Sequence, residues 1–433
     1  MSFTLTSPPE FIPGGRAQQA QAHQRLYLQC KQQGRYTDAL YHAQQAVQMA
    51  PERFHVWGNL ANIQRDLQDF ARAERSYQEA LRRCVDPQAR AQLRFNWALC
   101  QLAQGNYTQG WQGFLAKFAG GHERPAPDAL QVLPRWQGEA LAGKRVLVQA
   151  LEGFGDCLQW LRFVPLLGQA TGCQQVGFCS HPELSSLLLP PGARAYSPLH
   201  RVTFYKDAET ALHQDAFDLW LPLYALPHVC RAQLEHLPLP WAPLFPASVD
   251  GLPSPTKNED TGLRRVGIAW QANPLAPTAQ RRNLPLPQLV ALLRALSQQY
   301  PQLHFYSFQY HLSAADELEL QRVAAQLPLT DLRPQLHDFA HTAGFLQQMD
   351  ALITVDTVMA HLGAALRVPT RLLLSYVADW RWLSSVYRQS PWYPAERSDF
   401  ILFRQTEPGN WQSVCDALLP SFEGLSSRWC TPN

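Results

Sequence analysis

The chain has 433 residues, and its 37 lysines and arginines against 35 aspartates and glutamates leave a formal charge of +2. Its length predicts about three domains at roughly 150 residues each. A charge this close to zero argues against a dedicated nucleic-acid binder and against a polybasic membrane surface. The 46% apolar content is ordinary for globular domains that bury a core.

Membrane and secretion signals are not apparent in the sequence. No run of about 18 apolar residues is present, so no transmembrane helix is predicted. The segment Met1–Gly15 lacks a basic stretch followed by an apolar one, so no secretory signal is predicted. The nine cysteines are scattered without a C-x-x-C pair, which indicates neither a disulfide framework nor a zinc site. Together these features predict a cytoplasmic protein.

A helical repeat of 34 residues occupies the first third of the chain. Ala39 and Ala46 are followed 34 residues later by Ala73 and Ala80, and a third unit follows three residues out of phase. Small residues at these positions let two antiparallel helices approach closely. This spacing is the tetratricopeptide pattern, and it predicts three helical pairs over residues 16–122.

Such an array offers a concave surface, which holds a protein segment or packs on a neighbouring domain. The alternative is that the repeats serve only as a structural cap. The aromatic residues of the repeats are expected to fill the helix–helix core rather than to contact a ligand: Tyr27, Trp57, Trp97 and Trp111.

The remaining two thirds are predicted to form two α/β domains, over residues 134–250 and 262–420. A Pro-rich passage, Glu123–Pro134, ends the array, and a second loose stretch, Pro246–Gly262, separates the halves. The expected strands are Arg145–Leu151, Val176–Cys179, Phe217–Leu221, Val266–Trp270, His304–Phe308, Ala351–Val355 and Thr370–Ser375. The expected helices are Leu158–Leu167, Leu286–Tyr300, Ala315–Gln326 and Val358–Leu366. This alternation predicts parallel sheets, with ligands bound where strands end, at the cleft between the two halves.

The first candidate motif is Leu151–Cys157, directly after the first strand. Gly153 and Gly155 form a glycine turn that allows a ligand to approach the backbone closely. Asp156 then stands at the start of a helix and faces the cleft. Two interpretations remain open for this acid: a catalytic group or a helix N-cap, which aspartate favours.

Two further motifs occupy the second half. Asp356 and Thr357 lie at a strand-to-helix junction whose free N–H groups form an anion site. His361 lies about one turn into that helix, where an isolated histidine is more often a core residue. Arg281 and Arg282 precede the helix after the first strand of this half. They either brace a pyrophosphate or form a solvated face.

These residues resemble a known family. Lys144–Leu167, Val266–Pro285 and Asp338–Leu383 are similar, in this order, to three motifs of bacterial glycosyltransferases of the heptosyltransferase-like class. The resemblance covers nearly the whole chain. Three further segments resemble the subgroup that is fused to tetratricopeptide repeats: Ala378–Leu383, Ser390–Pro394 and Phe403–Gln405.

The resemblance implies tetratricopeptide repeats followed by a GT-B fold of two Rossmann-like domains. The acceptor would bind on the N-terminal side and the nucleotide-sugar on the C-terminal side. In this family the acid of the G-x-G-D motif is the proposed general base, which corresponds to Asp156. The donor diphosphate would bind at Asp356, Thr357 and His361.

The chain departs from the subgroup in two places. Gln271 and Ala272 replace a serine and a glycine, and the neutral Leu275–Gln280 lacks the usual basic residue, so Arg281 or Arg282 would supply the phosphate charge. His341 replaces the acid usual in a D-F-A-D-T segment.

No D-x-D pair occurs in the chain, so the usual metal–diphosphate clamp is absent. We therefore expect metal-independent transfer without a cofactor, with the leaving diphosphate held by the helix N-terminus, His361 and the arginines. Base selectivity is expected around Trp270, Gln309 and Asp379, and the run Trp380–Trp382 is expected to pack between domains.

The predicted function is transfer of a sugar from a nucleotide-sugar to a hydroxyl acceptor, such as a polypeptide presented by the repeats. Two alternatives remain: a glycan or lipopolysaccharide acceptor, and a non-catalytic scaffold.

Overall fold

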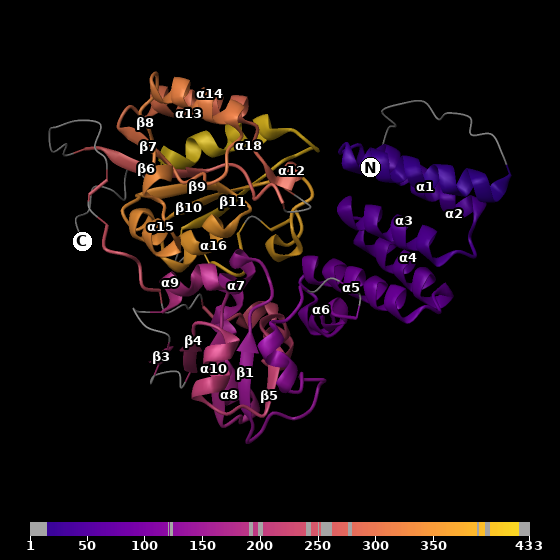
Figure 1. Cartoon of the computed structure of the whole chain (residues 1–433). Coiled ribbons are helices and arrows are strands. Elements are labelled where there is room, and N and C mark those ends of the chain that lie inside the picture. The colour runs from indigo at the N-terminus through magenta and orange to yellow at the C-terminus, as the bar shows by residue number, and fades with distance from the viewer. Residues whose placement is uncertain are drawn as a thin grey trace.

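The computed structural model describes residues 15–119, 121, 124–189, 194–197, 202–239, 244–249, 251–252, 262–275, 279–387, 389–394 and 399–423. The chain forms a helical array and two α/β domains, and the array lies beside both of them (Figure 1). Most of the predicted linker and the last cysteine, Cys430, lie outside the described residues.

Three antiparallel helical pairs make up the array. The pairs are α1 (Arg16–Gln32) with α2 (Tyr36–Met49), α3 (Phe54–Asp66) with α4 (Phe70–Arg83), and α5 (Pro87–Ala103) with α6 (Tyr107–Phe114). Ala39, Ala73 and Ala80 are fully buried, in keeping with the close helix approach that the spacing predicts.

The turn inside each pair uses a left-handed residue. Gly34 has a φ of 74° and Gly105 a φ of 84°, a conformation that glycine adopts without a steric cost. In the middle pair the corresponding residue is Gln68, with a φ of 60°. A non-glycine residue there carries strain of roughly 1–2 kcal/mol. Its side chain accepts a hydrogen bond from the Ser385 N–H of the C-terminal domain at 2.8 Å.

The N-terminal α/β domain is built on a five-stranded sheet with the order β3-β4-β2-β1-β5, in which only the pair of β3 and β4 is antiparallel. Its strands are β1 (Arg145–Gln149), β2 (Gln175–Cys179), β3 (Arg194–Ser197), β4 (Val202–Tyr205) and β5 (Leu219–Pro222). Its helices are α7 (Phe154–Trp160), α8 (Leu167–Thr171), α9 (Ser185–Leu188), α10 (Ala208–Gln214) and α11 (Leu226–Val229).

The C-terminal domain has a six-stranded parallel sheet with the order β11-β10-β9-β6-β7-β8. Its strands are β6 (Arg264–Ala269), β7 (Leu303–Ser307), β8 (Leu329–Asp331), β9 (Ala351–Val355), β10 (Thr370–Leu374) and β11 (Phe400–Arg404). Its helices are α12 (Ala279–Arg282), α13 (Leu286–Gln299), α14 (Ala314–Ala324), α15 (Phe339–Leu346), α16 (Val358–Ala365) and α18 (Trp411–Leu418).

Strand order in this sheet reverses between β6 and β9. The chain runs outward through β7 and β8, then returns to the other side of β6 to form β9, β10 and β11. Ligands of open α/β sheets bind at the carboxyl ends of strands beside such a switch point. The segments after β6 and β9, which carry the candidate arginines and Asp356, both leave the sheet at this edge.

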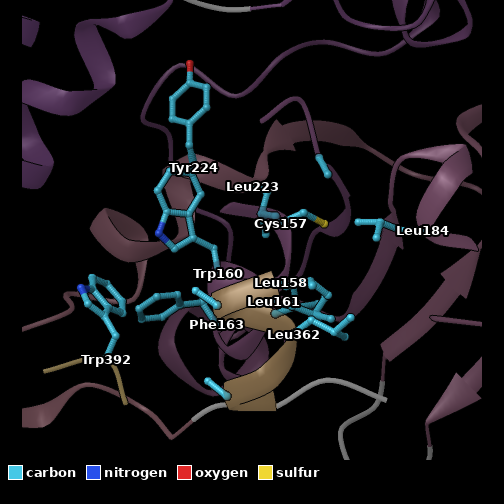
Figure 2. Packing of buried hydrophobic residues seen from close by; sticks show 14 of the residues in the cluster. Cys157, Leu158, Trp160, Leu161, Phe163, Leu184, Leu223, Tyr224, Leu362 and Trp392 are labelled. Atoms are coloured by element: carbon cyan, nitrogen blue, oxygen red, sulfur yellow. The ribbon is translucent and has the colours of Figure 1, made fainter. Parts of the chain in front are cut away.

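An aromatic cluster joins all three parts of the molecule. Trp392 is fully buried, and its ring lies 5.9 Å from that of Tyr107 in the array and 6.4 Å from that of Phe163 in the N-terminal domain, measured between centroids. Trp111 of the array also meets Trp380 of the C-terminal domain, at 5.3 Å. Figure 2 shows Trp392 beside Phe163, with Leu362 of α16 near Leu158 and Leu161. The array is therefore packed against both α/β domains.

The described helices include none that is both long and apolar enough to cross a bilayer. The eight cysteines in the described ranges are all free thiols.

Candidate functional site

The junction after β1 begins a helix earlier than predicted. We expected the helix at Leu158, but α7 starts at Phe154 with Gly153 as its N-cap. Asp156 therefore lies in the first turn of α7 and is not the N-cap, although its carboxylate accepts a hydrogen bond from the N–H of Gly153, the N-cap. The glycine turn has a packing reason as well, because a Cβ on Gly155 would lie 2.7 Å from the His361 ring. Only glycine lets α7 and α16 meet this closely.

Asp156 is tied across the domain interface to an arginine that sequence reasoning missed. Arg381, in the 3-10 turn Trp380–Trp382, forms an ion pair with Asp156. The same guanidinium lies 3.0 Å from Asp379 Oδ1 and donates from Nε to Gln159 Oε1 at 2.9 Å. Asp379 also caps this turn by accepting the Arg381 N–H at 3.1 Å. Of the Asp156 side chain, 27% stays exposed, so a ligand hydroxyl can reach it.

The electrostatics of this junction keep Asp156 ionised. Burial alone would raise the pKa of Asp156, but Arg381 and Lys117 outweigh it and hold that pKa below its ordinary value. The pKa of the neighbouring Glu152 is shifted in the opposite direction. Burial raises the pKa of Glu152 to about 7, although Lys117 and the Leu151 N–H oppose that rise.

His361 occupies a packing position. It is 3% exposed, its Nδ1 lies 2.6 Å from the Tyr393 hydroxyl, and its ring stacks on Trp382 at 5.5 Å. Burial and the nearby Arg381 lower the pKa of His361 to about 3. The imidazole is therefore neutral at pH 7 and carries no charge toward a diphosphate, so the donor-binding role that the resemblance implies would have to rest on hydrogen bonding.

A cavity of about 250 Å³ lies between the array and the carboxyl edge of the C-terminal sheet. It gathers four of the predicted donor-binding residues: Arg281, Arg282, Asp356 and Asp379. Arg281 and Arg282 lie on the short helix α12 rather than in the loop that we expected. Arg404 at the end of β11 and Arg65 at the end of α3 line the cavity as well, and neither was predicted.

Three of these arginines hold an N–H group without a hydrogen-bond partner in the part of the chain that the structure describes. These are Arg282 Nε, Arg404 Nε and Arg65 Nη1, and all three atoms are buried. Burial lowers the pKa of Arg404 to about 10. Buried cationic donors without partners are costly, and the residues that carry these three line one cavity. A cavity with four lining arginines is a candidate site for an anion.

Asp356 and Thr357 lie at the same edge of the sheet. Arg282 donates to the Asp356 carbonyl at 2.9 Å, and its Nη1 lies 3.8 Å from Asp356 Oδ2. That carboxylate oxygen is buried and accepts no hydrogen bond from the described residues. Burial raises the pKa of Asp356, with Arg282 and Arg381 opposing the rise. Thr357 is the N-cap of α16, where its hydroxyl accepts the Met359 N–H at 3.3 Å.

Trp270 and Gln309 lie in the fold core and do not line the cavity. Trp270 is 1% exposed within the cluster that α13 covers. Gln309 Oε1 accepts the Trp270 and Gln271 N–H groups at 3.0 and 2.8 Å, which fixes the loop after β6 to the loop after β7. Their predicted role in base selection is therefore indirect at most, through the shape of these loops.

A second cavity of about 530 Å³ opens at the carboxyl ends of β1, β2 and β4. Polar groups line it, among them Arg124, His181 and Asp207. His181 bonds to the Glu152 carbonyl, which connects this cavity to the β1–α7 junction. Among the described residues no cluster of three or more His, Cys, Asp or Glu side chains is placed to hold a metal ion.

Two of the missed residues had a signal in the sequence. Arg381 and Arg404 lie inside two of the segments that resembled the repeat-fused subgroup, Ala378–Leu383 and Phe403–Gln405. Arg65 carries no comparable signal, because nothing in a repeat pattern shows which turn faces a distant domain.

Comparison with known proteins bears on each part of this architecture. The tetratricopeptide repeat family matches residues 31–93. Protein FlbA of Caulobacter vibrioides is 24% identical over 362 residues, which cover 82% of this chain and 59% of the length of that relative.

Solved structures that are similar include a glycosyl transferase family 9 protein from Veillonella parvula, at 12% identity and a TM-score of 0.41 over 67% of this chain and 99% of that one. The E. coli ADP-heptose lipopolysaccharide heptosyltransferase II has 14% identity and a TM-score of 0.41 over 66% and 100% of the two chains. An O-GlcNAc transferase of Thermobaculum terrenum spans 96% of this chain and 94% of its own, at 12% identity and a TM-score of 0.30.

The N-terminal helices are tetratricopeptide repeats, and the rest forms two α/β domains on mainly parallel sheets. The predicted fold class, repeats followed by a GT-B fold of two Rossmann-like domains, is confirmed by the repeat match and by the two mainly parallel sheets.

Proposed function

We propose that this protein is a glycosyltransferase that moves a sugar from a nucleotide-sugar to a hydroxyl acceptor. The observation that carries the proposal is the arginine-lined cavity at the switch point of the C-terminal sheet. Its four lining arginines suit a diphosphate, which accepts several charge-assisted hydrogen bonds at once.

The departing nucleoside diphosphate needs its developing charge stabilised. Arg281, Arg282 and Arg404 supply fixed positive charge, and the N-terminus of α16 at Thr357 adds free N–H groups. With this number of cations available, we propose that transfer proceeds without a metal ion. Whether the sugar is a hexose or a heptose depends on contacts beyond the diphosphate.

The acceptor hydroxyl needs a base, and we assign that role to Asp156. Its depressed pKa keeps it ionised at neutral pH, and Arg381 orients the carboxylate. A carboxylate of low pKa takes a proton only late in the reaction, when bond formation to the sugar makes the hydroxyl acidic. The acceptor itself would enter by the cavity at the ends of β1 and β2.

For the acceptor we propose a cytoplasmic polypeptide, because repeat arrays of this kind hold protein segments. A glycan or lipopolysaccharide acceptor is the alternative within the same chemistry. Transfer assays with peptide and glycan acceptors in parallel distinguish the two.

A non-catalytic scaffold is the second candidate, and the Asp156–Arg381 ion pair favours it, since a clamp between domains would use the same two residues. The two functions make opposite predictions for ligand binding.

The test is a screen of nucleotide-sugars for thermal stabilisation and for donor hydrolysis, with wild type and Arg282→Gln side by side. We expect one nucleotide class to raise the melting temperature of the wild type and to be hydrolysed slowly. The stabilisation should shrink in Arg282→Gln. Absence of any shift at millimolar nucleotide would refute the transferase and leave the scaffold.

A further inference from the structure

One wall of the arginine-lined cavity belongs to the repeat array. Arg65 and Asp66, the last residues of α3, and Gln68 in the following turn line it from one side. Arg281 and Arg282 of α12 line it from the C-terminal domain. The candidate donor site is therefore enclosed by two parts of the chain that are more than 200 residues apart in sequence.

The array wall carries a surplus positive charge. Lys31 Nζ lies 2.7 Å from Asp66 Oδ2, and Arg65 Nη2 lies 3.0 Å from Asp66 Oδ1. Burial raises the pKa of Asp66, but Lys31 and Arg65 outweigh it and hold that pKa at about 2. The carboxylate is therefore ionised at pH 7 and balances only one of its two cations.

Arg281 adds a further cation at this wall. Burial raises the pKa of the Tyr36 phenol on the array, and the neighbouring Arg281 guanidinium partly offsets that rise. The charge of Arg281 also lowers the pKa of Lys31 and the pKa of Asp66. The arginines that line the cavity outnumber the lining aspartates by one, so an anion bound there would complete the charge balance.

The position of the wall is fixed by contacts on either side of the cavity. The strained Gln68 turn accepts the Ser385 N–H, and Tyr376 and Val377 after β10 pack against the core of the first helical pair. A cation on a wall held in this way is preorganised, so little freedom is lost when an anion binds.

We propose that the repeat array is part of the donor site, where Arg65 contacts the diphosphate together with Arg281, Arg282 and Arg404. The inference rests on the proposed function and makes the site incomplete without the array. Removal of residues 1–122 would then abolish donor binding as well as any presentation of an acceptor.

The experiment measures binding of inorganic pyrophosphate, ADP, UDP and GDP by calorimetry, with the full chain. Arg65→Gln tests the array wall, Arg282→Gln tests the opposite wall, and Arg72→Gln is the matched control. Arg72 is an array arginine whose side chain is 63% exposed, and it does not line the cavity. We expect each wall variant to weaken binding by about ten- to a hundredfold, and the control to leave it unchanged.

Each other outcome has a separate meaning. If only Arg282→Gln weakens binding, the donor site stands and the role of the array is refuted. If neither wall variant weakens binding, or if the wild type binds none of the probes, both the donor site and the array wall are refuted. If pyrophosphate binding needs both arginines but no nucleotide-sugar is turned over, the shared anion site stands and the transferase function fails.

Hydrogen exchange on the unmodified chain covers the case in which Arg65→Gln does not fold. Pyrophosphate should slow exchange at the end of α3 as well as at the start of α16. Protection at α16 alone would overturn the proposal.

Discussion

Two acids at related places in the two α/β domains have opposite ionisation behaviour. Asp156 and Asp356 each follow a buried parallel strand at its carboxyl end and lie at or just before the first turn of the next helix. The pKa of Asp156 is held below its ordinary value, whereas the pKa of Asp356 is raised above it. Burial pushes both pKa values upward. Arg381 and Lys117 outweigh it at Asp156, whereas at Asp356 the nearby Asp379 adds to it and the arginines do not outweigh the two.

Arg381 forms a direct ion pair with Asp156, but Arg282 Nη1 stays 3.8 Å from Asp356 Oδ2 and bonds to its carbonyl instead. The ionisation of each acid therefore depends on how closely a charged side chain approaches its carboxylate, and not on its place in the fold alone. Of the two, Asp156 is the acid whose ionised form the surroundings favour.

The largest expected effect comes from removing that base. Asp156→Asn should lower transfer by about 10²- to 10⁴-fold, the usual contribution of a positioned base. Donor affinity should change little, because Asp156 does not line the arginine cavity. Single-turnover transfer assays with donor titration check both expectations.

Asp156→Glu is the matched control, since it keeps the acid but displaces it. Full transfer activity in Asp156→Asn, with donor affinity unchanged, would show that Asp156 is a structural partner of Arg381 and not the base.

Arg381→Gln should lower stability by about 2–4 kcal/mol, because it leaves Asp156 and Asp379 without their shared cation. The substitution should also raise the pKa of Asp156, which is the direction of the shift at Asp356. Urea denaturation measures the first effect, and the acid limb of the transfer rate against pH measures the second. An unchanged acid limb would contradict the role given to Arg381.

The double variant Arg381→Gln with Asp156→Asn should lose less stability than the sum of the single changes. Additive losses would mean that the two residues do not interact.

Glu152 sharpens the comparison, since it is an acid at the same junction with no arginine beside it. Its pKa of about 7 in the folded chain lies above the ordinary value of 4.5. Folding then favours the protonated acid, so the associated stability is present in full below pH 4.5 and is lost as the pH rises through 7. The loss is about 3 kcal/mol.

Glu152→Gln mimics the protonated acid and should remove this loss. Denaturation at pH 5 and pH 8 should show the wild type falling relative to the variant between the two values. Parallel behaviour of the two proteins would rule out a raised pKa for Glu152.

The smallest effect is expected at Asp356. Because burial raises the pKa of Asp356 and its Oδ2 accepts no hydrogen bond from the described residues, Asp356→Asn should change stability by less than about 1 kcal/mol in the absence of a ligand. A loss of several kcal/mol would show instead that Asp356 is ionised and paired with Arg282. Urea denaturation at pH 7 decides between the two.

Local patterns in the sequence predicted much of this arrangement. The 34-residue spacing of alanines indicated the repeats, and the strand-to-helix junctions at Asp156 and Asp356 were placed correctly at the carboxyl ends of parallel strands. The start of α7 was missed because Gly153 and Gly155 favour a loop locally. In the fold, contact with His361 supports helix from Phe154 onward.

Contacts between distant segments could not be predicted. Arg381 lies 225 residues after Asp156, and no local spacing connects them. The same holds for Arg65, whose position at the cavity depends on how the array docks. His361 was given a phosphate-binding role by analogy, but its state depends on Tyr393 and Trp382, which pack around it from later in the chain.

The aromatic cluster around Trp392 has a consequence for synthesis on the ribosome. Tyr107 and Trp111 emerge early, but Trp380 and Trp392, against which they pack, follow some 270 residues later. At 5–20 residues per second, that gap leaves the aromatic face of α6 uncovered for roughly 15–55 s. Nascent chains at this stage expose an apolar, aggregation-prone surface. The yield of folded protein should therefore depend on chaperones that cover the array until the C-terminal domain is complete.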